Sequence, residues 1–329
     1  MMDTMELDGL HRPFKVNRPL TKHEKDSRLY IKEPSGAEPL NLLGTLRMNS
    51  TYLEFRDKFL MRKGEWGMWS AIGVTLAWVM FVTFMIFLVP AIPNVLNGTE
   101  REPIAVVFGI LLVTASAIGF PWFAWRYRCG KDFFRYTHYP MRFNRRNRKV
   151  YFFRLDGTVR VVDWEKLYAT LGKAKDGDVW ETRLHVLAED GETVLETYAL
   201  GYAGRATDPG VLAQWEFIRL YMEEGPEKLL PLLEDIDIHD IVDRKETFGR
   251  GFKLLEMQFG FVMAPLVFLA AIARHYAMKT CKIPRWPEEV ERECAFAEGD
   301  PYEVDARRLP SEAKAALGLP VEEEVYRRV

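Results

Sequence analysis

The segment EDIDIHDIVDRKE holds the densest group of metal-ligand side chains in the chain: Asp235, Asp237, His239, Asp240 and Asp243. In an extended conformation Asp235, Asp237 and His239 share one face, and two oxygens with one nitrogen suit a divalent metal. In a helix Asp235, His239 and Asp243 share a face instead, and Asp237 turns away. Acidic segments of this kind are more often solvated linkers. We therefore predict a linker, and keep the metal site only as an alternative.

The other ionisable residues show no pattern typical of an enzyme. No phosphate-binding loop, zinc-finger spacing, nucleophile elbow or His-Glu-x-x-His motif is present. The remaining single candidates for acid–base chemistry are isolated: His138, His185, His275 and Glu256. Three cysteines are too few and too scattered for a disulfide framework. We predict a protein that is not an enzyme and that needs no cofactor.

A second charged group lies in HYPMRFNRRNRKVYFFRLDGTV, residues 138–159. Five basic residues fall within eight positions there: Arg142, Arg145, Arg146, Arg148 and Lys149. A net charge of -2 argues against a nucleic-acid-binding protein, whose binding domain would normally be basic. Two interpretations stay open: a solvated hairpin, or a hairpin touching anionic lipid headgroups, where each charge contributes about 1 kcal/mol. We assign the five residues as candidate headgroup contacts.

Two long apolar runs predict a transmembrane helical hairpin over residues 67–125. Residues 67–92 and 104–125 carry no charge, and about 20 apolar residues suffice to cross a bilayer as a helix. Basic residues flank the hairpin on its outer sides: Arg56, Lys58, Arg62 and Lys63 before it, and Arg126, Arg128, Lys131 and Arg135 after it. The positive-inside rule then predicts a multi-pass inner-membrane protein with both termini in the cytoplasm.

A third apolar run covers residues 257–273 and is interrupted by Pro265. With 17 residues it is at the lower limit for crossing a bilayer. We favour a membrane-surface or shallow re-entrant helix. A buried helix of the soluble domain and a third span remain as alternatives.

Residues 138–225 alternate apolar and polar side chains between turn signals such as Asp156-Gly157, which predicts an antiparallel β-meander. An amphipathic helix carrying Val211, Trp215 and Ile218 on one face follows. This order is typical of a pleckstrin-homology-like domain. We predict an α+β membrane protein: an N-terminal cytoplasmic tail and pre-span segment (1–66), the hairpin, the β-domain, and a helical C-terminal segment (226–329).

The C-terminal segment contains PRWPEEVEREC followed by EGDPY. Trp286 is expected to dock against the β-domain, and exposure of its ring would mark a partner-binding surface. The hairpin, residues 138–159 and these two motifs together resemble a family of uncharacterised bacterial two-span membrane proteins, known only as a domain of unknown function. The resemblance covers residues 49–302.

Proteins of that family are often encoded near type VI secretion effector genes. The resemblance therefore implies an immunity or accessory protein that sequesters a cognate effector or toxin. It supplies no catalytic residues. A lipid-responsive membrane adaptor using the basic hairpin and a metal-dependent membrane enzyme using residues 235–243 remain as alternatives. The sequence predicts membrane lipids and a partner protein as contacts, excludes nucleic acid, and leaves the oligomeric state open.

Overall fold

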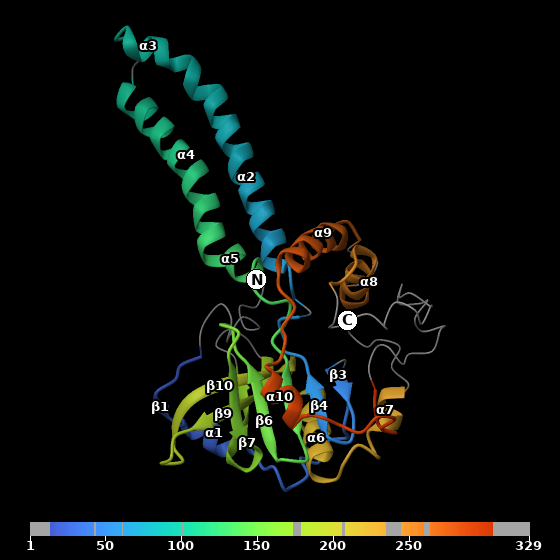
Figure 1. Cartoon of the computed structure of the whole chain (residues 1–329). Helices are drawn as coiled ribbons and strands as arrows, with labels where there is room; N and C mark the ends of the chain where they lie inside the picture. The colour runs from blue at the N-terminus through green and yellow to red at the C-terminus, as the bar shows by residue number, and fades with distance from the viewer. Residues whose placement is uncertain are drawn as a thin grey trace.

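A computed structural model describes residues 14–42, 44–60, 62–99, 102–173, 179–205, 208–234, 245–259 and 264–304. Two long helices form a hairpin that projects from a body of two β-sheets, and a pair of shorter helices lies at the foot of the hairpin (Figure 1). The chain is thus an α+β protein, as predicted.

The body contains two five-stranded antiparallel sheets, one of which curls into half of a barrel. The first has the order β1 (Arg18–Pro19), β10 (Thr193–Arg205), β9 (Val179–Leu187), β8 (Leu167–Lys173), β2 (Arg28–Leu29). The second has the order β3 (Thr45–Met48), β4 (Tyr52–Phe55), β5 (Met141–Asn144), β6 (Lys149–Phe153), β7 (Val159–Asp163). The turn predicted at Asp156-Gly157 joins β6 to β7, with Gly157 at a φ of 88° that favours glycine.

The core of the body lies between the sheets and helix α6 (Gly210–Glu223). The predicted apolar face of α6 is buried, since Trp215 and Ile218 are both 0% exposed. The indole of Trp215 stacks on that of Trp164, which belongs to the short η4 turn (Trp164–Lys166) after β7. Burial of such large side chains is the main term that stabilises the body.

Strands β1 to β4 and helix α1 (Lys22–Asp26) lie where we predicted an N-terminal tail. They are too short to show a periodicity of their own. β1, β2 and β4 pair with strands far away in sequence, and β3 joins the sheet through β4. Phe55 of β4, for example, pairs with Met141 of β5. The body therefore includes this N-terminal segment and is larger than the predicted domain over 138–225.

Because β4 and β5 are neighbours in one sheet, residues 56–140 form an insertion between two paired strands. This insertion contains α2 (Glu65–Leu88), η2 (Val89–Ala91), α3 (Ile92–Leu96), α4 (Pro103–Ala124), a π-helical turn η3 (Trp125–Cys129) and α5 (Gly130–Asp132). Its ends both return to the same sheet, so the start of α2 and the end of α4 lie on the same side of the hairpin (Figure 1).

Helices α2 and α4 are long and apolar enough to cross a membrane. Their 24 and 22 residues span about 36 and 33 Å, compared with about 30 Å for a bilayer core. They correspond to the two apolar runs at 67–92 and 104–125, so the predicted helical hairpin is confirmed as a pair of helices.

The C-terminal segment supplies α7 (Leu230–Glu234), α8 (Phe248–Phe259), α9 (Ala264–Thr280) and α10 (Glu288–Glu293). The apolar run 257–273 is divided between the end of α8 and the start of α9, with 260–263 outside the described residues. Helix α9 packs on α8 and on α2, and α10 lies against the second sheet.

Candidate functional site

Arg142 lies inside the molecule, with a side chain 1% exposed. Its guanidinium donates to Glu54 Oε2 at 2.7 Å and to both Glu291 oxygens at 3.0 and 3.1 Å. It also lies over the rings of Tyr52 and Trp286, 4.6 and 4.8 Å from their centroids. Burial raises the pKa of Glu54, but the charges of Arg142 and Arg47, together with the hydrogen bond from Arg142, outweigh it and keep that pKa below its ordinary 4.5. Arg142 thus fastens α10 to the sheet.

The other four basic residues contact α6, α10 and the η4 turn. Arg148 donates to Glu165 at 2.7 Å and to Glu223 at 2.6 Å. The longer contacts join Lys149 Nζ to Glu293 Oε2 at 3.2 Å, Arg146 Nη2 to the Glu293 carbonyl at 3.3 Å, and Arg145 Nη2 to the Glu224 carbonyl at 3.4 Å. These contacts give residues 145–149, which we call the basic turn, a structural role within the chain.

The register of the second sheet fixes where this basic turn lies. Met141, at the start of β5, pairs with Phe55, from which the chain leaves for α2. Asn144, at the start of the turn, pairs with Tyr52 at the other end of β4. The turn therefore lies at the end of the sheet away from the hairpin, a position that argues against the predicted headgroup contact.

Of the remaining predicted residues, the structure describes Trp286 but not the acidic cluster. Trp286 is half-buried and meets Phe153 edge-on at 5.7 Å, so it docks on the body. Asp235, Asp237, His239, Asp240 and Asp243 lie outside the described residues, and within the described ranges no three His, Cys, Asp or Glu side chains are placed to hold a metal.

The three histidines and Glu256 also remain separate. His138 contacts the Thr137 hydroxyl at 2.9 Å, while His275 and Glu256 are half-buried. Burial lowers the pKa of His185 to about 4, so this imidazole is neutral near pH 7. It lies between the hydroxyls of Thr170 and Thr197, at 3.2 and 2.8 Å, and is enclosed by the first sheet and α1.

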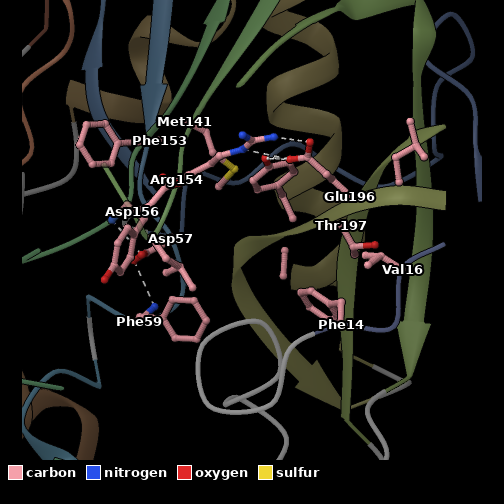
Figure 2. Close-up of a pocket in the computed structure, with 15 residues that line it drawn as sticks. Phe14, Val16, Asp57, Phe59, Met141, Phe153, Arg154, Asp156, Glu196 and Thr197 are labelled. Atoms are coloured by element: carbon pink, nitrogen blue, oxygen red, sulfur yellow. Dashed lines mark hydrogen bonds and ion pairs between the residues drawn. The ribbon is translucent and has the colours of Figure 1, made fainter. Parts of the chain in front are cut away.

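A cleft of about 580 Å³ opens between the two sheets, next to the connections that lead into the hairpin (Figure 2). Its volume is within the range of about 300–1,000 Å³ that small-ligand sites occupy. The lining comes from five separate segments: Phe14 and Val16; Asp57 and Phe59; Tyr139 and Met141; Phe153 to Asp156; and Leu195 to Ala199.

Asp57 joins the two connections between the hairpin and the body. Its Oδ1 accepts from the backbone N–H groups of Phe59 and Leu60 at 3.1 and 3.0 Å, and its Oδ2 accepts from that of Tyr139 at 2.9 Å. The first two follow β4 and the third precedes β5. Burial raises the pKa of Asp57 to about 6, although the three hydrogen bonds favour the ionised form.

Glu196 forms the polar centre of the opposite wall. Arg154 donates to both carboxylate oxygens, and the Tyr198 hydroxyl donates to Oε2 (Figure 2). Arg160 approaches the same carboxylate to 3.4 Å. The two arginines compensate the negative charge of Glu196. This wall therefore presents a fixed hydrogen-bonded group and not a free charge.

The cleft is chemically suited to binding. Most of its lining is aromatic or aliphatic, and no His, Cys, Ser or Lys stands among the described residues that line it. Sequence reasoning missed it because its five segments come from distant parts of the chain and none carries a motif. The weak signal was the spacing of Glu196 and Tyr198, which places both on one face of β10.

Comparisons with known proteins identify one family. Residues 122–298 match a family of unknown function, DUF6708. The match covers more than half of the chain, from the end of α4 through α10, and includes β5 to β10. No curated protein and no solved structure matches the chain.

Proposed function

This chain belongs to DUF6708, a family without an assigned function, and from its structure we propose a membrane-anchored binding protein. In this proposal α2 and α4 cross the membrane, and the cleft between the sheets receives a segment of a partner protein. The observation that carries it is the insertion of the hairpin between β4 and β5. The cleft is lined by residues of both connections, Asp57 and Phe59 on one side and Tyr139 on the other.

Exposure of large apolar side chains supports the anchor. Phe87, Leu96 and Phe108 are 73, 80 and 64% exposed, whereas soluble proteins rarely expose contiguous apolar surface on this scale. Exposed Trp122, Trp125 and Tyr127 gather where α4 returns to the body, the position expected for interfacial aromatic residues. Basic residues on this side, including Arg126 and Arg135, favour a cytoplasmic body and an inner-membrane location.

The chemistry of the cleft favours a partner that supplies an apolar side chain next to hydrogen-bond donors. Its walls are largely apolar, while the exposed Asp156 adds acceptor oxygens. The resemblance to proteins encoded beside type VI secretion genes makes a secreted effector or toxin the partner we propose. The chain would then be an immunity or accessory protein. Antiparallel strands followed by α6 also follow the order of a pleckstrin-homology-like domain, an analogy of fold and not of ligand.

The direct test pairs the chain with the product of its neighbouring gene. That product is expressed in a naive host with and without this protein, and the complex is recovered in detergent. We expect rescue of growth and a one-to-one complex. A toxic neighbour that is neither neutralised nor bound would overturn the proposed pairing.

Two variants test whether the partner binds in the cleft. Leu155 lines the cleft and is 41% exposed, while Val161 on β7 is 43% exposed and does not line it. Leu155→Asp is expected to lose binding and Val161→Asp to keep it. Equal behaviour of the two variants would place the binding surface elsewhere.

The two alternatives gain no comparable support. The lipid-responsive adaptor depends on the basic turn, which is paired within the chain at the end of the sheet away from the hairpin. The metal-dependent enzyme depends on residues 235–243, which lie outside the described part of the chain.

A further inference from the structure

Helix α9 has its large and small side chains on unexpected faces. Phe268, Leu269 and Tyr276 are 50, 46 and 59% exposed. The opposite face is buried, and half of its six residues are alanines: Val267, Ala270, Ala271, Arg274, Ala277 and Met278. A helix of a water-soluble body would bury its large apolar residues and expose small or polar ones.

This orientation is fixed by close contacts with the foot of the hairpin. A Cβ atom on Gly64, the residue before α2, would lie 2.3 Å from Arg274 Cα, so only glycine allows this approach. Arg274 donates to the carbonyl of Leu60 at 2.8 Å and to both oxygens of Glu246 at 2.8 Å. Rotating the exposed face of α9 inward would carry Arg274 away from these partners and leave the buried Glu246 carboxylate without its cation.

The inner face of α9 is packed against hydrophobic neighbours. Met68 of α2 and Leu255 of α8 form one cluster with Val267, Ala270 and Ala271. The helix lies beside the foot of α2, on the side of the hairpin next to the sheet body (Figure 1). Its outer face is exposed. The exposed residues of α9 therefore continue the apolar surface of the hairpin at its end next to the body.

Charged groups border this apolar face. Lys279 is exposed at the C-terminal end of α9, and Lys253 of α8 and Lys282 just after α9 are exposed as well. The carboxylate of Glu246, in contrast, is buried against Arg274. Lysine side chains beside an apolar face are typical of helices in a membrane surface, where the ammonium groups reach the headgroups.

We propose that α9 is an interfacial helix that lies in the membrane surface on the side of the body, with Phe268, Leu269 and Tyr276 at the boundary between headgroups and acyl chains. Its partner is the lipid bilayer itself, and anionic headgroups meet the bordering lysines. This inference rests on the proposed membrane anchor. It adds a third attachment, which holds the body, and the cleft with it, at a defined distance from the bilayer.

The test measures the depth of single sites in the full chain. In a Cys129→Ser background, Leu269→Cys, Leu112→Cys and Val161→Cys are each labelled with a nitrobenzoxadiazole fluorophore and reconstituted in phosphatidylcholine–phosphatidylglycerol vesicles. Leu112 is exposed near the middle of α4, and Val161 is exposed on the body, so they are the deep and the aqueous controls. Lipids brominated near the headgroup or near the chain end then quench the fluorophore according to depth.

We expect the label at position 269 to lose most of its emission with headgroup-proximal bromine and little with chain-end bromine. The label at 112 should show the opposite preference, and that at 161 should respond to neither. Absence of quenching at 269 with normal quenching at 112 would overturn the inference and leave the anchor standing. Preferential chain-end quenching at 269 would also overturn it, in favour of a deeply inserted helix. Absence of quenching at 112 would overturn the proposed anchor itself.

Discussion

Phenylalanine takes opposite positions in the two parts of this molecule. In the sheet body Phe55, Phe143 and Phe152 are fully buried, whereas in the hairpin Phe87 and Phe108 are 73 and 64% exposed. The body also buries ion pairs, while the hairpin helices carry no charged residue from Trp66 to Leu88 or through α4. The same apolar side chain thus forms core in one part and outer surface in the other. This contrast is expected of a chain whose body faces water and whose hairpin faces lipid.

The contacts within each part differ accordingly. The body is held by large side chains, such as the ring of Phe152 stacked on that of Tyr198 at 3.9 Å. The hairpin is held through small ones: a Cβ atom on Gly73 of α2 would lie 2.9 Å from the ring of Phe120 of α4. Close approach at small residues is how helices associate in lipid, where burying large apolar groups gains little.

The largest expected change in stability comes from replacing phenylalanine by alanine, once in the body and once in the hairpin. Phe152→Ala should lower the free energy of unfolding of the body by about 3–5 kcal/mol, because it empties a fully buried site. Phe108→Ala should change it by less than about 0.5 kcal/mol, because that ring is mainly exposed. Urea unfolding of the full chain in detergent, followed by tryptophan fluorescence, measures both. Similar losses of unfolding free energy in the two variants would contradict the difference between the body and the hairpin.

The second prediction separates two arginines of the β5–β6 hairpin, Arg142 on the strand and Arg146 in the turn. Arg142→Gln should cost about 3 kcal/mol, because it leaves the buried Glu54 carboxylate without its cation. Arg146→Gln is the matched control, since Arg146 is exposed and touches only a carbonyl through its side chain, and should cost less than about 0.5 kcal/mol. Equal costs would mean that Arg142 is not the fastening between α10 and the sheet.

Asp57 predicts a pH dependence at the junction of the two parts. Its pKa is raised from 3.8 to about 6, so the folded chain holds the proton more tightly than the unfolded chain. The stabilisation from this group is present below about pH 4 and is lost as the pH rises to about 6, by at most about 3 kcal/mol.

Asp57→Asn should remove this slope from the unfolding free energy measured between pH 4 and 6, and the exposed Asp156→Asn should leave it unchanged. A slope that persists in Asp57→Asn would assign it to another group.

The smallest predicted effect concerns packing inside the hairpin. Gly73→Ala should destabilise the contact between α2 and α4 by about 1 kcal/mol, because the new methyl group overlaps Phe120. Gly119→Ala is the control: nothing lies within 4 Å of its Cβ position, and alanine favours the helix. Thermal unfolding followed by circular dichroism in detergent compares them. A destabilised Gly119→Ala together with a neutral Gly73→Ala would reverse the predicted order.

Periodicity predicted the parts of the fold that depend on local sequence. The uncharged runs gave α2 and α4, and alternation with turn signals gave the antiparallel strands after Pro140 and the buried face of α6. Strands β1 to β4 escaped prediction because two to four residues carry no period, and β1, β2 and β4 pair with distant strands.

The candidate site was harder to predict for the same physical reason. The five clustered cations look equivalent in the sequence, but Arg142 alone meets two carboxylates and two rings inside the molecule, since its strand lies under α10. The cleft has lining residues from positions 14 to 199, so it exists only once both sheets are assembled.

The central claim is that the hairpin crosses a membrane and leaves the body on one side. Labelling with a membrane-impermeant maleimide tests it most directly, using Leu96→Cys at the tip of the hairpin and Val161→Cys on the body, each in the Cys129→Ser background. Both positions are exposed, so their labelling reports the side of the membrane. The account predicts that Leu96→Cys reacts in intact cells and that Val161→Cys reacts only after the membrane is opened. Reaction of both from the same side would contradict it.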